Sequence, residues 1–147
     1  RRTQTTTVDA ERQLVQFPNQ ATPEPWQPGV QDRLSVFVQL GAWVASAPTA
    51  FEAGQNFKLS VWSSRQTEVW LVAALGREKM PTPYGEQLAW RLKRLPLGAS
   101  DAQIDIWYVP DWGPLPVRVE WLEANGNRVE QSLKGLLPAP AGQPRTP

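Results

Sequence analysis

Residues 104–136, IDIWYVPDWGPLPVRVEWLEANGNRVEQSLKGL, decide the fold class of this chain. Alternating apolar and polar residues, which are typical of half-buried strands, flank the turn formers DWGP at 111–114. A second turn is predicted at Asn125-Gly126, the dipeptide best suited to a type I′ turn because both central residues need positive φ. Successive short strands joined by tight turns predict an antiparallel meander.

The sequence before this stretch predicts more strands, at residues 57–61, 67–75 and 86–95. The strand at 67–75 is apolar on both faces, so we expect it to lie between two layers. Residues 3–8 and 12–17 predict a hairpin that mostly faces solvent. Prolines exclude a helix or a central strand from residues 18–31, which we interpret as an extended surface loop around Trp26.

One helix is predicted, over residues 33–46, with Asp32 as its N-cap and Pro48 beyond its end. One face at helical spacing consists of six residues: Leu34, Phe37, Val38, Gly41, Val44 and Ala45. The opposite side is also apolar, through Val36, Leu40 and Trp43. A helix that is apolar almost all round should be enclosed by other structure over most of its circumference.

The fold class that satisfies both patterns is mainly β, a curled antiparallel meander of seven or eight strands wrapped around one α-helix. Such a sheet forms a half-barrel or β-spiral whose hollow side receives the helix. We expect a single domain over residues 1–137 and a disordered, proline-rich tail over 138–147.

Composition excludes several classes of function. Histidine and cysteine are both absent, which removes the usual residues of nucleophilic triads, zinc sites, haem sites and iron–sulfur clusters, so we expect no metal and no cofactor. The formal net charge is +1 and the basic residues are scattered, so nucleic acid is not an expected partner. The chain starts at Arg1 without methionine, and we expect an upstream segment.

Five short motifs together resemble a known family. They are VQDRLS at 30–35, TPYG at 82–85, WRL at 90–92, IW at 106–107 and LPVRV at 115–119. The chain resembles the DUF3108 family of bacterial envelope proteins over residues 1–136. The resemblance implies a protein exported to the periplasm, often tethered to the inner membrane by an N-terminal segment that this chain lacks. It also implies a shape similar to periplasmic lipoprotein carriers, with further strands ahead of Arg1 and no assigned catalytic residues.

Eight tryptophans in 147 residues favour aromatic binding surfaces as well as an aromatic core. Trp70, Trp90 and Trp121 occupy strand positions whose alternation predicts core packing. Trp26 and Trp112 lie in loops, where exposure and binding are easier to accommodate.

The most specific ligand hypothesis concerns the second side of the helix. If the missing strands leave that side open, Val36, Leu40 and Trp43 line a groove between helix and sheet. The alternative is that the domain's own strands close this groove.

The carboxylates of the last third of the chain offer the available general acids and bases, but we predict no catalytic residues. Asp105 and Glu120 alternate outward as solvated strand residues do, and Glu120 should pair with neighbouring arginines. DWG at 111–113 is interpreted as a turn. The basic run 91–94 could contact anionic lipid head groups, but it is more typical of a solvated strand end.

The sequence therefore predicts a non-enzymatic envelope protein that binds an apolar or amphipathic ligand, such as a lipid, or an envelope protein partner. Two alternatives remain open. One is a carbohydrate-binding or carbohydrate-active module that uses Trp26 and Trp112. The other is a structural domain that completes its sheet with another chain, or self-associates, through an exposed sheet edge.

Overall fold

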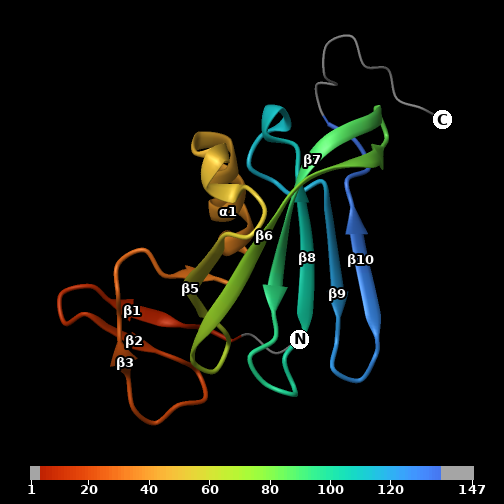
Figure 1. The fold of residues 1–147 in the computed structure, drawn as a ribbon. Coiled ribbons are helices and arrows are strands. Elements are labelled where there is room, and N and C mark those ends of the chain that lie inside the picture. Colours follow the sequence, from red (N-terminus) through yellow and green to blue (C-terminus); the bar gives the residue numbers. More distant parts are fainter. Residues whose placement is uncertain (1–3, 137–147) are drawn as a thin grey trace.

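Seven strands form one curled, half-barrel sheet around helix α1 (Ser35–Ser46) in this computed structural model, which describes residues 4–136 (Figure 1). From edge to edge the strands are β10 (Arg128–Ser132), β9 (Arg118–Leu122), β8 (Gln103–Tyr108), β7 (Gly85–Leu95), β6 (Thr67–Thr82), β5 (Asn56–Trp62) and β4 (Gln31–Asp32). All neighbours are antiparallel except β4 and β5. The predicted fold class is confirmed, while the predicted tail at 138–147 lies outside the described residues.

A small second sheet lies at the N-terminal end, at the lower left of Figure 1. Its strands are β1 (Thr7–Asp9), β2 (Leu14–Gln16) and β3 (Glu24–Pro25). The predicted hairpin is confirmed, but the expectation that it mostly faces solvent is wrong for its second half. Val15 and Phe17 are fully buried, and the ring of Phe17 packs edge-on against Trp62 at 6.4 Å. This aromatic contact attaches the small sheet to the end of β5.

Helix α1 begins two residues later than predicted, and its N-cap is Leu34, so the prediction of Asp32 as the N-cap is wrong. Asp32 nevertheless binds the first N–H groups of the helix from two residues further back. The Asp32 carboxylate accepts hydrogen bonds from the backbone N–H groups of Leu34 at 2.7 Å and Ser35 at 3.0 Å. It also accepts one from the Ser35 hydroxyl at 2.8 Å. After the helix, a short 3₁₀ segment, η1 (Pro48–Phe51), starts at the predicted stop residue Pro48.

The helix is covered on one side, so the prediction that it is enclosed over most of its circumference is wrong. Its buried residues are Val36, Phe37, Leu40, Gly41 and Val44. Leu34 is 79% exposed, Val38 40% and Trp43 37%. The physical reason is that the half-barrel sheet, within the described chain, curls round one side of α1 and stops there.

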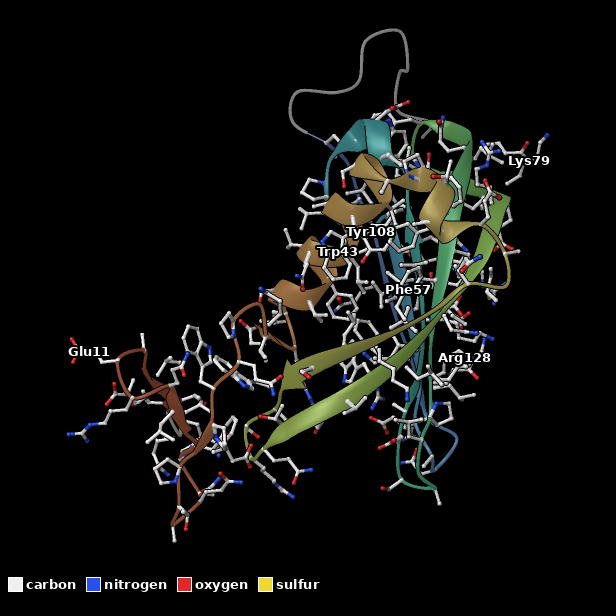
Figure 2. All side chains as sticks on the ribbon, turned by 60° about the vertical axis from the view of Figure 1, so that its left-hand side comes forward. Glu11, Trp43, Phe57, Lys79, Tyr108 and Arg128 are labelled. Carbon is white, nitrogen blue, oxygen red and sulfur yellow. The ribbon has the colours of Figure 1, made fainter. Side chains whose placement is uncertain are left out.

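Two contacts at the middle of the helix hold it in the hollow of the sheet. The hydroxyl of Tyr108, a fully buried residue of β8, donates a hydrogen bond of 2.8 Å to the carbonyl of Phe37, and Figure 2 shows Tyr108 beneath α1. Gly41 approaches the loop after β8 so closely that an added Cβ would lie 1.9 Å from the carbonyl oxygen of Pro114. Only glycine fits at this crossing.

The sheet carries an apolar cluster on each face, and its strands differ from the predictions in two places. Trp70 and Val72 of β6 belong to the core under α1, but Val69 is 50% exposed, so this strand is not buried on both faces as predicted. β6 also continues past the predicted end through a bulge between Ala74 and Arg77. On the convex face a smaller cluster contains Met80, Ala89, Trp107, Val109 and Val117.

Both predicted hairpins at the C-terminal end are confirmed, but the turn type at Asn125-Gly126 is wrong. Gly126 has φ of +89°, whereas Asn125 is not among the described residues with positive φ. The N–H of Glu123 donates to the carbonyl of Asn127 at 2.8 Å, which leaves a three-residue loop. This is the type I turn followed by a left-handed glycine, in which one positive φ is enough.

Candidate functional site

Three aromatic residues from three different elements meet at the N-terminal end of α1. Phe37 of the helix packs edge-on between Trp70 of β6 and Trp121 of β9, with ring centroids 6.1 Å and 6.0 Å apart. These rings line a pocket of about 560 Å³ whose rim includes Arg33 and Arg94. We call it the aromatic pocket.

An apolar groove adjoins this pocket along the uncovered flank of the helix. It has a volume of about 440 Å³ and shares Leu34, Phe37 and Trp121 with the aromatic pocket. Beyond them it is lined by Val38, by Leu115 and Pro116 of the loop before β9, by Val119 and by Gln131 of β10. We call it the side groove. Because most of its lining is apolar, it can bury hydrocarbon, which water solvates poorly.

On the other side of the aromatic pocket lies a polar pocket of about 510 Å³. The two share Arg33, Ser100 and Asp101, and the polar pocket adds the 63–66 turn and Glu68. The three spaces therefore run in the order apolar, aromatic and polar. Such a gradient matches a molecule with a hydrocarbon end and a polar end.

Arg94 is the most unusual polar group of the aromatic pocket. It extends from β7, is 6% exposed, and its guanidinium carbon lies 4.9 Å from the ring centroid of Trp70. Its Nη1 donates to the carbonyl of Ala102 at 2.6 Å, but Nη2 is 3.9 Å from Oδ2 of Asp101, beyond hydrogen-bond range. Its Nε and the indole N–H of Trp70 are buried with no acceptor among the described residues. Burial lowers the pKa of Arg94, and the charges of Asp101 and Glu68 do not offset this.

The helix residues predicted to line a groove lie in two different places. Val36 and Leu40 are fully buried in the core and reach no surface. Trp43 borders a separate, shallow pocket of about 250 Å³, together with Gln27, Pro28 and Lys58. The open flank beside the side groove carries Leu34 and Val38, because the helix is rotated relative to the predicted faces.

The two loop tryptophans are not brought together. Trp26 follows β3 in the small sheet and donates its backbone N–H to the carbonyl of Gln13 at 2.7 Å. Trp112 belongs to the 3₁₀ segment η2 (Pro110–Trp112) and packs edge-on against Tyr84 at 5.4 Å. The small sheet and η2 lie at opposite ends of the molecule in Figure 1. The two indoles therefore do not line one sugar-binding groove.

The carboxylates of Asp105 and Glu120, on the convex face, form ion pairs with arginine side chains. Glu120 contacts Arg118 and lies 3.9 Å from Arg128, as predicted. Asp105 was expected to be solvated, but it is 6% exposed, because Arg91 holds it at 2.7 Å and covers it. Among residues 4–136 no cluster of three acidic side chains could hold a metal ion.

Sequence reasoning assigned Trp70 and Trp121 to the core and Arg94 to a solvated strand end, and it missed the pocket that they form. The interpretation of Arg94 is wrong, since this residue is buried. A signal was present: Trp90, Leu92 and Arg94 follow one another at a spacing of two, so all three occupy the same face of β7. Both of those neighbours are buried under α1.

Comparisons with known proteins give one match. The model of a family described as "Protein of unknown function (DUF3108)" matches residues 1–134. No curated protein and no solved structure matches the chain. In the part of the chain that the structure describes, no helix has the length and apolar character needed to cross a membrane.

Proposed function

The chain belongs to the DUF3108 family, and we propose that it is a non-enzymatic binding protein of the cell envelope that holds an amphipathic molecule. The hydrocarbon part occupies the side groove and the polar part occupies the aromatic pocket. The observation that carries this proposal is the adjacency of the two spaces, whose linings share Leu34, Phe37 and Trp121.

The energetics of the groove support this assignment. Each methylene moved from water into an apolar site contributes about 0.8 kcal/mol, so ten of them contribute about 8 kcal/mol before the costs of binding are subtracted. The exposed side chain of Leu34 and the half-exposed Val38 are apolar surface that a bound chain would remove from water. Exposed apolar residues gathered in one groove are typical of binding sites.

Quenching by a brominated lipid tests the proposal directly, because Trp70 and Trp121 line the aromatic pocket. A monoacylglycerol with a dibrominated chain is titrated against the protein, and we expect saturable quenching of tryptophan emission. Val38→Glu places a charge in the side groove and should weaken the quenching about tenfold or more, since a charge is costly beside hydrocarbon. Unchanged quenching in this variant would contradict the assignment of the groove.

Val69→Glu is the matched control. Val69 is also a half-exposed valine, but it lies on β6 outside the pockets described above. This variant should bind the brominated lipid as the parent does. Mass spectrometry of an organic extract of the purified protein should show a copurified amphipathic molecule, which the Val38→Glu variant should lose.

A second candidate function, completion of the sheet by another chain, rests on β10. This edge strand pairs with β9 alone, and all five of its residues are exposed. Unpaired edges are templates for another strand. Sedimentation at several protein concentrations checks this candidate, since a self-associating sheet gives a concentration-dependent mass and a monomeric carrier does not.

The periplasmic location is part of the proposal as well. It follows from the resemblance to exported envelope proteins, and fractionation of cells that express the complete gene product checks it. Recovery in the cytoplasmic fraction would remove the envelope part of the proposal and leave the binding part to the quenching experiment.

A further inference from the structure

We propose that Arg94 holds a singly charged oxyanion, such as a carboxylate or a phosphodiester, at the polar end of the amphipathic molecule in the aromatic pocket. This inference rests on the proposed function and adds the chemistry of the head group. The geometry that points to it is one unoccupied edge of the guanidinium.

A guanidinium presents Nε–H and one terminal N–H₂ side by side, and an oxyanion accepts from both at once. In Arg94 this edge consists of Nε, which has no acceptor, and Nη2, whose ion-pair partner Asp101 is 3.9 Å away. The guanidinium carbon lies over the ring of Trp70, which gives Nε and Nη2 no carboxylate or carbonyl acceptor.

The same strand shows what such an edge accepts. In Arg91, three residues earlier on β7, Nε and Nη2 both donate to Oδ1 of Asp105, at 3.0 Å and 2.7 Å. Arg91 also stacks on a tryptophan, Trp107, with its guanidinium carbon 5.1 Å from the ring centroid. Arg94 repeats this arrangement on the concave face, but no carboxylate lies within hydrogen-bond distance of its Nε or Nη2.

Neighbouring acids do not supply the missing group. Asp101 Oδ2 already accepts from the backbone N–H groups of Leu97 at 3.0 Å and Gly98 at 3.1 Å. Oε1 of Glu68 is held by Arg33 at 2.6 Å, and its Oε2 accepts no hydrogen bond from Arg94 or from any other described residue. Buried charges are normally paired, so a desolvated guanidinium beside an open pocket is a site for an anion from outside the chain. Burial lowers the pKa of Arg94, because the charges of Asp101, 3.9 Å away, and Glu68 do not offset the loss of hydration.

The remaining charges of the pocket limit the charge of the ligand. Asp101 and Glu123 line the aromatic pocket together with Arg33 and Arg94. A head group with two negative charges would be repelled by the two carboxylates, whereas a single charge can be offset by Arg94 alone. A cationic head group would lie against Arg94 and be rejected.

Four lipids with the same oleoyl or oleyl chain test the inference, each used below its aggregation concentration and at mildly alkaline pH. They are oleate, oleoyl lysophosphatidylglycerol, monoolein and oleylamine, and their binding is followed by tryptophan emission and by calorimetry. Oleate or the phosphodiester should bind about tenfold or more tightly than monoolein, and the stronger of the two identifies the oxyanion. Equal affinity for oleate, oleoyl lysophosphatidylglycerol and monoolein would overturn the inference and leave the proposed function standing. If none of the four lipids bound, the proposed function would be overturned.

Arg94→Gln should lower the affinity for the preferred anion about tenfold or more and abolish the preference for this anion over monoolein. A variant that folds and keeps the preference for anions overturns the inference. Arg77→Gln is the matched control, because Arg77 also lies over a tryptophan, 5.1 Å from the ring centroid of Trp90, but does not line the pocket. It should keep the preference.

Asp101→Asn decides the question if Arg94→Gln does not fold. Asparagine retains an oxygen for the N–H groups of Leu97 and Gly98 and removes one negative charge from the rim. The ratio of the affinity for the anion to the affinity for monoolein should rise several-fold. A fall or no change in this ratio would overturn the inference.

Discussion

Arg91 and Arg94 lie three residues apart on β7, on opposite faces of the sheet, and both stack on a tryptophan. On the convex face, burial lowers the pKa of Arg91, but hydrogen bonds and charge from Asp105 and Glu78 more than offset this and raise it overall. On the concave face, burial dominates and the pKa of Arg94 is lowered.

The two arginines differ in their hydrogen bonds: the donors of Arg91 are paired with carboxylates, whereas Nε of Arg94 has no acceptor. The convex arginine, its carboxylates and Trp107 form a closed network, since the indole N–H of Trp107 also donates to Glu78 at 2.7 Å. Arg94, on the concave face, lines the aromatic pocket, and its Nε–H has no hydrogen-bond acceptor among the described residues. We infer that the convex face serves stability and that the concave face serves binding, and four predictions test this separation.

The largest effect on stability is expected from Gly41→Ala, which disrupts the packing of α1 in the hollow of the sheet without changing a charge. The new methyl group would lie 1.9 Å from the Pro114 carbonyl oxygen, so α1 or the loop must move, at a cost of about 3 kcal/mol in the free energy of unfolding. Urea denaturation measures this loss. Helix propensity alone favours alanine by about 1 kcal/mol, so a gain in stability would show that the close contact is absent.

A direct comparison is the pair Arg91→Met and Arg94→Met. Removal of Arg91 leaves the buried carboxylate of Asp105 without its main partner and should lower the free energy of unfolding by about 2 kcal/mol. Removal of Arg94 deletes a desolvated cation without a hydrogen-bonded acid, so its effect should stay within about 0.5 kcal/mol. Equal losses in the two variants, measured by urea denaturation, would show that the two faces do not differ.

Tyr108→Phe removes the hydrogen bond between the sheet and the helix. Burial raises the pKa of Tyr108 well above its ordinary value, so the hydroxyl remains a donor at all moderate pH values. Its loss leaves the Phe37 carbonyl with one partner fewer and should lower stability by about 1 kcal/mol. Thermal unfolding checks this, and an intact chain that melts at the parent temperature would contradict the assigned hydrogen bond.

The smallest effect concerns Asp32 at the start of α1, near the aromatic pocket. Partial burial raises the pKa of Asp32, but hydrogen bonds from Ser35 and Leu34 outweigh burial and lower it overall. A lowered pKa in the folded state stabilises the protein above the unfolded-state value and is lost as the pH falls through both values. Asp32→Asn should therefore reduce stability by about 0.5 kcal/mol at neutral pH. The difference should vanish in acid, and a difference that persists there would exclude a charge effect.

Periodicity was sufficient to predict the helix, the meander and both C-terminal hairpins, because alternation and turn residues are local signals. It did not predict how far the sheet curls, which decides that Leu34 and Val38 face an open groove. It also missed the continuation of β6 past Leu75, because the bulge between Ala74 and Arg77, with Gly76 at φ of +78°, interrupts the alternation.

The candidate site was less accessible to sequence reasoning than the fold. Phe37, Trp70 and Trp121 come from elements far apart in the chain, and their mutual contacts depend on the sheet register. Arg94 stands in a basic run, where composition favours exposure, and only its spacing from Trp90 and Leu92 indicates the buried face. Whether a buried arginine has found a counter-ion depends on tertiary geometry.

The edge position of β10 has a consequence for selectivity. One wall of the side groove is made by the β9–β10 hairpin, which nothing in the described chain supports from beyond β10. Because the hairpin is paired on one side only, a small outward movement of β9 and β10 costs little free energy. The width of the side groove can therefore adjust to the ligand. We therefore expect the protein to accept ligands with branched, unsaturated or longer hydrocarbon tails. Selectivity should depend almost entirely on the polar head group.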